Sequence, residues 1–265
     1  MTTLTATQIE SFERDGYILL QNIIPPETLA QLSAEFQQWV EESRPHTKPY
    51  GTTHNNRARF DIEPGHSAEA PALWRIASPV EISESYLTFM RDNPALDAVV
   101  NLFGPNIRFE NAKINSKQPG AAPEVKFHQD FLFEPHTNDD MIAVLFFIDD
   151  VTEQNGPLEI VPGSHKGPLY EHWHNGTFTG AVSDSVATEM KPRAIPCYGA
   201  AGSACLMHAR LLHGSAPNLS TQPRTLYIIE YYAEDAYPLQ SNHIPSQYMC
   251  EVVRGEATGR VRCSD

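Results

Sequence analysis

The sequence predicts a mainly β, single-domain jelly roll with flanking α-helices, and three observations support this fold class. Helical periodicity is confined to residues 1–104. Beyond them, short apolar runs separated by turn residues recur at roughly regular spacing, as in antiparallel sandwiches and barrels. Finally, His128 and Asp130 interrupt an apolar run in the pattern K-F-H-Q-D-F-L-F, and a rolled sheet would bring them a further ligand from a distant strand.

The composition limits the class of protein. With 265 residues, of which 41% are hydrophobic, the chain can bury a substantial core. Its formal net charge of −14 argues against nucleic acid and an anionic membrane surface as partners. No apolar run approaches the ~18 residues that a transmembrane helix needs. We therefore expect a small-molecule substrate, and we leave open whether the chain forms a homodimer.

The four cysteines and the first residues bear on location. Cys197, Cys205, Cys250 and Cys263 form no C-x-x-C pair, which argues against a zinc cluster and against thioredoxin-like chemistry. The N-terminus has neither a basic segment nor an apolar one, so no signal peptide is predicted. Reduced thiols in the cytoplasm are the simplest interpretation.

Two helices and a strand are predicted before residue 43. Thr5 and Gln8 fit a capping box, and Gly16 suits the end of the helix that follows. The apolar run after Gly16 is a candidate strand. Pro25 and Pro26 suit the first turn of a second helix, whose apolar stripe should pack against the barrel. The stripe consists of Leu29, Leu32, Phe36, Trp39 and Val40.

Residues 43–80 show no clear periodicity and are rich in Pro, Gly, His, Asn and Arg, which is typical of a loop or lid. Residues 166–194 are similarly irregular and form a second candidate lid. For the charged side chains of the first lid, a solvated loop is the simpler interpretation. The alternative is that one of three arginines, Arg57, Arg59 or Arg75, meets an acidic group on the substrate.

The whole chain divides into three parts of one domain. Residues 82–91 and 94–103 read as further helices, which complete a mostly helical N-terminal part with its lid, 1–104. Residues 105–240 hold the predicted jelly-roll core, and residues 241–265 form a C-terminal tail.

Short strands are predicted throughout the core. The run M-I-A-V-L-F-F-I is continuously apolar, so its strand should be buried on both faces. Another strand carries His128 and Asp130. The predicted strands cover residues 107–115, 125–133, 141–148, 158–161, 204–207 and 225–233.

The segment around His128 is the candidate metal site. Val and Phe near it favour an extended strand, and positions i and i+2 of a strand project to the same face. His128 and Asp130 can therefore bind one metal ion together. His213, which precedes Gly214, is the best candidate for the third ligand. It would complete the 2-His-1-carboxylate triad of non-haem Fe(II) oxygenases.

A co-substrate site is expected beside this triad. Three octahedral positions would remain open on the iron, enough for a bidentate 2-oxo acid and O2. The far carboxylate of 2-oxoglutarate would also need a partner, and the planar fork of an arginine matches a carboxylate. Arg224 begins the next strand, and a hairpin-like return would bring it back beside His213. Ser215 is placed to donate a hydrogen bond to the same carboxylate.

Several motifs resemble the phytanoyl-CoA dioxygenase family of Fe(II)/2-oxoglutarate oxygenases, which includes ectoine hydroxylase. They are F-E-R-D-G-Y-I-L-L, G-P-N-I, K-I-N-S-K-Q-P-G, F-H-Q-D, N-G-P-L-E-I-V-P-G-S-H-K, and L-L-H-G-S-A-P-N with the trailing Arg224. The resemblance implies a double-stranded β-helix, the cupin-like form of the jelly roll. It also implies that oxidative decarboxylation of 2-oxoglutarate by O2 is coupled to oxidation of a C–H bond, with release of succinate and CO2.

The resemblance implies roles for individual residues as well. It makes His128, Asp130 and His213 the Fe(II) ligands. The residues implied to hold 2-oxoglutarate are Arg224, Ser215, Asn115 and, as a weaker candidate on the strand face of Asn115, Asn111.

Asp130 also bears on the outcome of the reaction. Halogenating relatives have Gly or Ala at this position, so Asp130 favours hydroxylation over halogenation. The expected substrate is a small polar metabolite. Desaturation, cyclisation and epimerisation use the same iron chemistry and stay open. The alternative of another class is a catalytically silent jelly roll that serves as a binding or sensor module. The presence of all three ligands together with Arg224 argues against that alternative.

Overall fold

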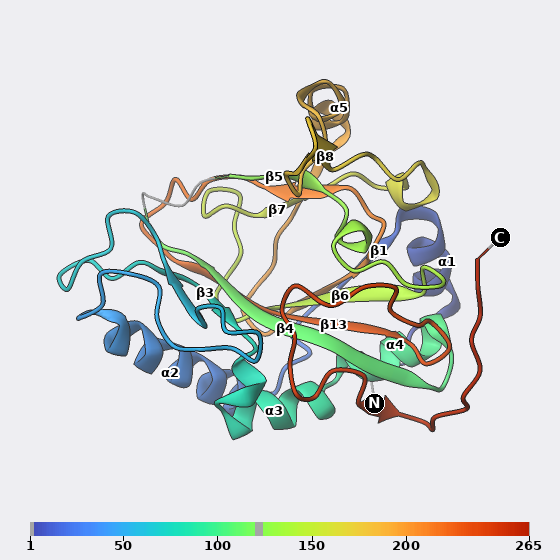
Figure 1. The fold of residues 1–265 in the computed structure, drawn as a ribbon, viewed down its shortest axis with the longest axis horizontal. Coiled ribbons are helices and arrows are strands. Elements are labelled where there is room, and N and C mark those ends of the chain that lie inside the picture. Colours follow the sequence, from blue (N-terminus) through green and yellow to red (C-terminus); the bar gives the residue numbers. More distant parts are fainter. Residues whose placement is uncertain (1–2, 120–123, 265) are drawn as a thin grey trace.

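Two antiparallel sheets form the centre of the computed structural model, which describes residues 3–119 and 124–264 (Figure 1). The large sheet has the strand order β1 (Tyr17–Leu20), β11 (Ala204–His208), β6 (Met141–Phe147), β13 (Arg224–Ala233), β4 (Ile107–Lys117), β3 (Leu73–Ala77) and β2 (Phe60–Ile62), and β14 (Val252–Arg254) also pairs with β4. The small sheet has the order β10 (Ile195–Cys197), β7 (Leu158–Ile160), β12 (His213–Ser215) and β5 (Val125–His128). A separate hairpin joins β8 (Trp173–His174) to β9 (Thr177–Phe178). The arrangement confirms the predicted mainly β jelly roll.

The helices flank these sheets. In Figure 1, α2, α3 and α4 lie along the face of the large sheet that is turned away from the small sheet, and α5 projects beyond the small sheet. The α-helices of the described residues are α1 (Ala6–Asp15), α2 (Pro26–Ser43), α3 (Glu84–Arg91), α4 (Ala95–Phe103) and α5 (Asp184–Met190). Short 3-10 turns are η1 (Pro79–Glu81), η2 (Asp130–Leu132), η3 (Ser164–Lys166) and η4 (Lys191–Arg193).

Strand β6 shows why the run M-I-A-V-L-F-F-I contains no polar residue. Successive side chains of a strand point to opposite faces. Val144 and Phe146 pack in the core that the helices share with the large sheet. Leu145 and Phe147 pack between the two sheets, against Leu158 of β7. Both faces are thus buried, as predicted.

The N-terminal helix has the predicted ends. The Thr5 side chain accepts from the backbone N–H of Gln8, and the Gln8 side chain accepts from the backbone N–H of Thr5, so the capping box is present. Gly16 ends α1 with φ +81°, a left-handed conformation that glycine adopts at little cost. Strand β1 then begins at Tyr17 and places α1 beside the edge of the large sheet.

Four local predictions were wrong. The irregular segment 43–80 contains β2 and β3, which extend the large sheet. The irregular segment 166–194 contains the hairpin of β8 and β9 and the helix α5. The strand expected over 125–133 ends at His128, and Asp130 begins the turn η2. Arg224 does not return in a hairpin beside His213, because β12 belongs to the small sheet and β13 to the large one. The connection between β12 and β13 therefore crosses the space between the sheets.

Candidate metal centre and active site

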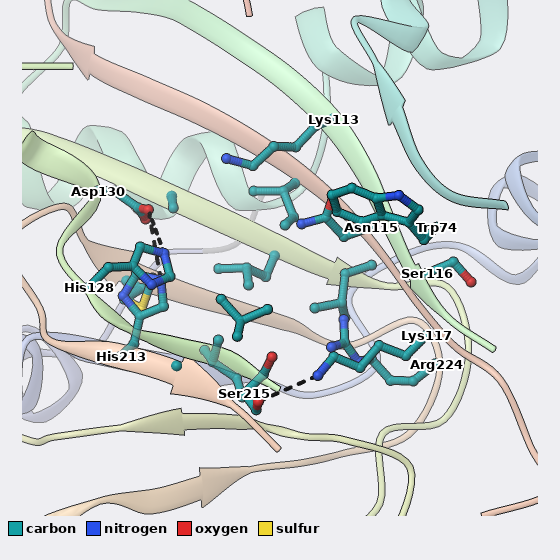
Figure 2. Close-up of a pocket in the computed structure, with 18 of the residues that line it drawn as sticks. Trp74, Lys113, Asn115, Ser116, Lys117, His128, Asp130, His213, Ser215 and Arg224 are labelled. Carbon is teal, nitrogen blue, oxygen red and sulfur yellow. Dashed lines mark hydrogen bonds and ion pairs between the residues drawn. The ribbon is translucent and has the colours of Figure 1, made fainter. Parts of the chain in front are cut away.

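His128, Asp130 and His213 meet at one end of a cavity between the sheets (Figure 2). His128 and His213 are direct partners across β5 and β12. Nε2 of His128 lies 3.5 Å from Oδ1 of Asp130, and Nε2 of His213 lies 3.8 Å from the same atom. One ligand atom from each residue lies within 4.8 Å of the others. Three residues from three elements therefore converge on one point, although Asp130 comes from a turn and not from the strand.

Backbone carbonyl groups fix how the two imidazoles face. His128 Nδ1 lies 2.9 Å from the Lys126 carbonyl oxygen, and His213 Nδ1 lies 3.0 Å from that of Leu211. A carbonyl oxygen only accepts, so each Nδ1 carries the proton and each Nε2 keeps its lone pair. Both lone pairs are then available to a metal ion, in the tautomer that metal-binding histidines adopt with such partners.

The charge state of the three residues suits a divalent metal. Burial, helped by the neighbouring His128, lowers the pKa of His213 to about 4, so this imidazole is neutral at neutral pH. Burial alone would raise the pKa of Asp130, but His213, His128 and the Lys113 ammonium outweigh it and hold the pKa below its usual range. Neutral imidazole and ionised carboxylate are the forms that bind metal. Two nitrogen donors and one oxygen donor fit Fe(II).

The cavity runs from this triad to Arg224 and has a volume of about 500 Å³. Apolar side chains of both sheets form most of its middle, and charged groups lie at its two ends. The apolar lining consists of Ala143, Leu145, Leu158, Met207, Leu226 and Ile228, with Val125 of β5 and with Pro64 and Trp74 of the segment 43–80. A site of this kind is typical for a small ligand that polar groups orient.

The end of the cavity opposite the triad is basic. Arg224 is 3% exposed, and its Nε donates to the Gly156 carbonyl oxygen at 3.0 Å. Burial lowers the pKa of Arg224 to about 10, so the guanidinium stays charged at neutral pH. Lys117, its cross-strand partner on β4, donates to the Ser215 carbonyl oxygen at 3.4 Å and also to that of Ala216. Figure 2 shows Lys117, Arg224 and Ser215 around this end.

Strand β4 contributes more to the cavity than one asparagine. Asn115 lines it, and its buried Oδ1 has no hydrogen bond donor among the described residues. Lys113, two residues earlier, also lines the cavity and lies 3.1 Å from Glu230 of β13. Burial alone would lower the pKa of Lys113, but Glu230 and Asp130 raise it above its ordinary value. Lys113 therefore carries a positive charge on the side of the cavity that Asp130 occupies.

Four predicted residues lie outside the cavity lining. Asn111 shares the strand face of Asn115, but its amide donates to both carboxylate oxygens of Glu134 at 2.7 and 2.8 Å. The buried Arg59 guanidinium donates to the carbonyl oxygens of residues 52, 77 and 78 and to the carboxylate of residue 81, so the prediction that it meets substrate disagrees with its contacts. Arg75 pairs with Asp61 at 2.6 Å, and Arg57 is exposed.

Sequence reasoning missed Lys113 and Lys117 as cavity residues. Both stand in the motif A-K-I-N-S-K, at positions two before and two after Asn115. Since alternate residues of a strand share a face, the assignment of Asn115 to the cavity implied the same for both lysines. Ala112 and Ile114, the two neighbours of Lys113, confirm the alternation because they pack on the helical side of the sheet.

Comparison with known proteins agrees with this geometry. The model of the family described as phytanoyl-CoA dioxygenase (PhyH) matches residues 12–226. The chain belongs to the phytanoyl-CoA dioxygenase family. It is 33% identical, over 257 residues, to a probable alpha-ketoglutarate-dependent hypophosphite dioxygenase of Stutzerimonas stutzeri, and the match covers 96% of this chain and 87% of that protein. It is 30% identical to an L-proline trans-4-hydroxylase of Streptomyces griseoviridis over 159 residues, 52% of this chain and 59% of that protein.

Solved structures share the fold of this family. A crystal structure of EctD from S. alaskensis with bound Fe superimposes with a TM-score of 0.71 at 22% identity, covering 98% of this chain and 87% of that one. With its family relatives and its histidine–aspartate–histidine centre, this member of the phytanoyl-CoA dioxygenase family is an Fe(II)- and 2-oxoglutarate-dependent dioxygenase. In residues 3–119 and 124–264, no helix combines the length and the apolar character that crossing a membrane requires.

Proposed function

We propose that this dioxygenase hydroxylates a small molecule that carries an acidic group, with 2-oxoglutarate held between the metal ligands and Arg224. The observation that carries the proposal is a single cavity with His128, Asp130 and His213 at one end and a buried arginine at the other. Fe(II), held by these three ligands, would supply the activation of O2 that the reaction requires.

The chain's own residues would orient the co-substrate. The Arg224 guanidinium offers a planar fork to the far carboxylate, the Ser215 hydroxyl can donate to it, and the Asn115 amide lies along the cavity wall between the two ends. The reaction balances without another reductant. O2 gives one oxygen atom to succinate and one to the product. Two electrons come from the decarboxylation of 2-oxoglutarate and two from the substrate bond that is oxidised, a C–H bond or, in hypophosphite, a P–H bond.

Lys113 supports an acidic group on the substrate. Its ammonium points into the cavity towards Asp130 in Figure 2, and it uses one side for Glu230. An ammonium has three N–H donors, so donors remain for an oxyanion of the substrate. The hypophosphite dioxygenase relative, by its name, acts on a small oxyanion, which agrees with a cation at this place. Hypophosphite and small phosphonates or carboxylates are therefore the first candidates.

A substrate panel tests this proposal. Purified enzyme with Fe(II), 2-oxoglutarate and O2 is offered hypophosphite, small phosphonates, amino acids and the neutral amide or alcohol analogue of each acid. We expect succinate to form in step with consumption of an acidic compound only. The double variant K113M/E230Q removes the ammonium without leaving a buried carboxylate unpaired, and it should raise KM for that compound. Equal turnover of a neutral analogue contradicts the role of Lys113.

Product analysis separates the remaining outcomes of the same chemistry. With labelled O2, hydroxylation places one labelled atom in succinate and one in the product. Desaturation, cyclisation and epimerisation leave the product unlabelled. A protein that binds metal and 2-oxoglutarate but forms no succinate with any compound would instead be a silent binding module.

Whether the chain forms a homodimer stays open, and the cytoplasmic location stays a prediction. Light scattering on the purified enzyme tests the first. Supporting the second, all four cysteines lie in the described residues and are free thiols.

A further inference from the structure

The basic end of the cavity contains two cations. Lys117 is 6% exposed and Arg224 3% exposed, and they face each other across β4 and β13. Buried like charges repel, so an anion bound between the two would lower the cost of burying both. A carboxylate offers two oxygens with about four acceptor positions, which can accept an arginine fork on one side and an ammonium on another.

Local structure holds the lysine in this place. Gly156, in the N-G-P turn, has φ +85°, and a Cβ there would lie 2.8 Å from Cδ of Lys117 and 2.7 Å from the Ala216 carbonyl oxygen. The turn therefore needs glycine to leave room for the lysine stem, while its carbonyl oxygen accepts from Arg224. Asn218 donates to the Lys117 carbonyl oxygen at 2.9 Å and fixes the end of β4.

We propose that Lys117 is a second cationic binding residue for the far carboxylate of 2-oxoglutarate, and that with Arg224 it selects 2-oxo acids that have a second carboxylate. This inference rests on the proposed function for the position of the co-substrate. It adds a residue and a selectivity that the triad and Arg224 do not require.

The surroundings of Lys117 also give co-substrate binding a pH dependence. Burial, and then the facing Arg224 of β13, lower the pKa of Lys117 to about 7. The acids that act on it in the opposite direction are Glu63 after β2, Glu159 of β7 and Glu124 before β5. An anion bound to the ammonium favours its protonated form. Binding of 2-oxoglutarate should therefore take up protons near pH 7.5 and almost none at pH 6.

Calorimetric titration of the Mn(II)-loaded protein under argon tests the inference without catalysis. The ligands are 2-oxoglutarate and 2-oxobutyrate, which lacks the far carboxylate. Lys117→Met should weaken 2-oxoglutarate roughly tenfold to hundredfold, the usual size of a lost charged hydrogen bond. It should leave 2-oxobutyrate unchanged and abolish the proton uptake. Lys117→Arg should keep most of the affinity. The exposed Lys48→Met is the control for loss of one charge, and melting temperatures show that each variant folds.

The outcomes separate the two proposals. If wild type binds 2-oxoglutarate and Lys117→Met binds it equally well, the inference is wrong and the proposed function stands. Proton uptake that persists in Lys117→Met but disappears in Glu63→Gln also overturns it. If wild type binds no 2-oxoglutarate, both proposals fail.

Discussion

The two ends of the cavity handle buried charge in opposite ways. At the triad, Asp130 is ionised and His213 is held neutral. This end therefore favours binding of a cation. At the other end, Arg224 and Lys117 lie together, so this end favours binding of an anion. The apolar middle separates the two. A metal ion at one end and a keto-diacid at the other complement this pattern, so the comparison teaches that each end carries the charge opposite to that of its proposed ligand.

The largest effect is expected at the metal end. Asp130→Ala should lower succinate formation by more than about 100-fold, because losing a ligand exceeds the ~10–100-fold cost of losing a group that merely orients one. The rise in melting temperature on adding Fe(II) or Mn(II) should vanish with it. Asp184→Asn, whose side chain is 97% exposed, is the matched control. A variant at Asp130 that still gains stability from metal would remove Asp130 from the ligand set.

The basic end should respond next. Arg224→Met should weaken 2-oxoglutarate binding by about 2–5 kcal/mol, the range for truncating one side of a buried charge pair. Arg224→Lys keeps the charge but not the planar fork, so it should recover part of this loss. Calorimetry measures both, with the exposed Arg14→Met as control. Metal binding should be unchanged, and a parallel loss of metal affinity would show that the two ends do not act separately.

Stability should depend on pH differently at the two ends. The pKa of His213 is about 4 and that of Lys117 about 7, each below the ordinary values of 6.5 and 10.5. Between the folded and ordinary values the unfolded chain binds more protons, so the free energy of unfolding rises with pH. His213, together with the buried His208 and the half-buried His243, should raise the free energy of unfolding as pH rises from 4 to 6.5. Lys117 should raise the free energy of unfolding as pH rises from 7 to 10.5.

Denaturant unfolding of the metal-free protein across this pH range measures both effects, each on the order of 1–3 kcal/mol. Lys117→Met should flatten the alkaline rise and leave the acid one. An unchanged alkaline rise in that variant would mean that Lys117 keeps an ordinary pKa.

The smallest effect belongs to a residue outside both ends. Thr5→Ala removes the capping box of α1 and should cost about 1 kcal/mol of stability. Thermal unfolding measures this cost. Affinities for metal and for 2-oxoglutarate should stay at their wild-type values. A change in either would show that α1 is coupled to the cavity through β1.

The sequence predicted the chemistry of the site better than its geometry. The four predicted residues, His128, Asp130, His213 and Arg224, all line the cavity, because few chemistries need those residue types in such motifs. The turn at Asp130 and the crossing from β12 to β13 were missed. Strand ends and sheet membership depend on pairing between segments far apart in the chain, which local propensity does not report.

The lid shows the same limit. Arg59 looked available to a substrate, since irregular segments usually expose their charges. In the structure it is 6% exposed and binds the backbone around the turn η1. Strands β2 and β3 provide the pairing that buries it, and neither is long enough to show a clear alternation.

Strand β4 carries Lys113 and Lys117, one at each end of the cavity, about 13 Å apart for an extended chain. The distance between these two lysines thus sets the length of the molecules that the cavity can hold. A shift of one residue in the pairing of β4 with its neighbouring strands would turn all of its cavity-facing side chains to the helical face at once. A substitution at one of the two lysines, by contrast, would change the binding of either the substrate or 2-oxoglutarate and leave the binding of the other unchanged. New substrate preferences in this lineage should therefore arise by exchange of single side chains on β4, with the length of the strand preserved.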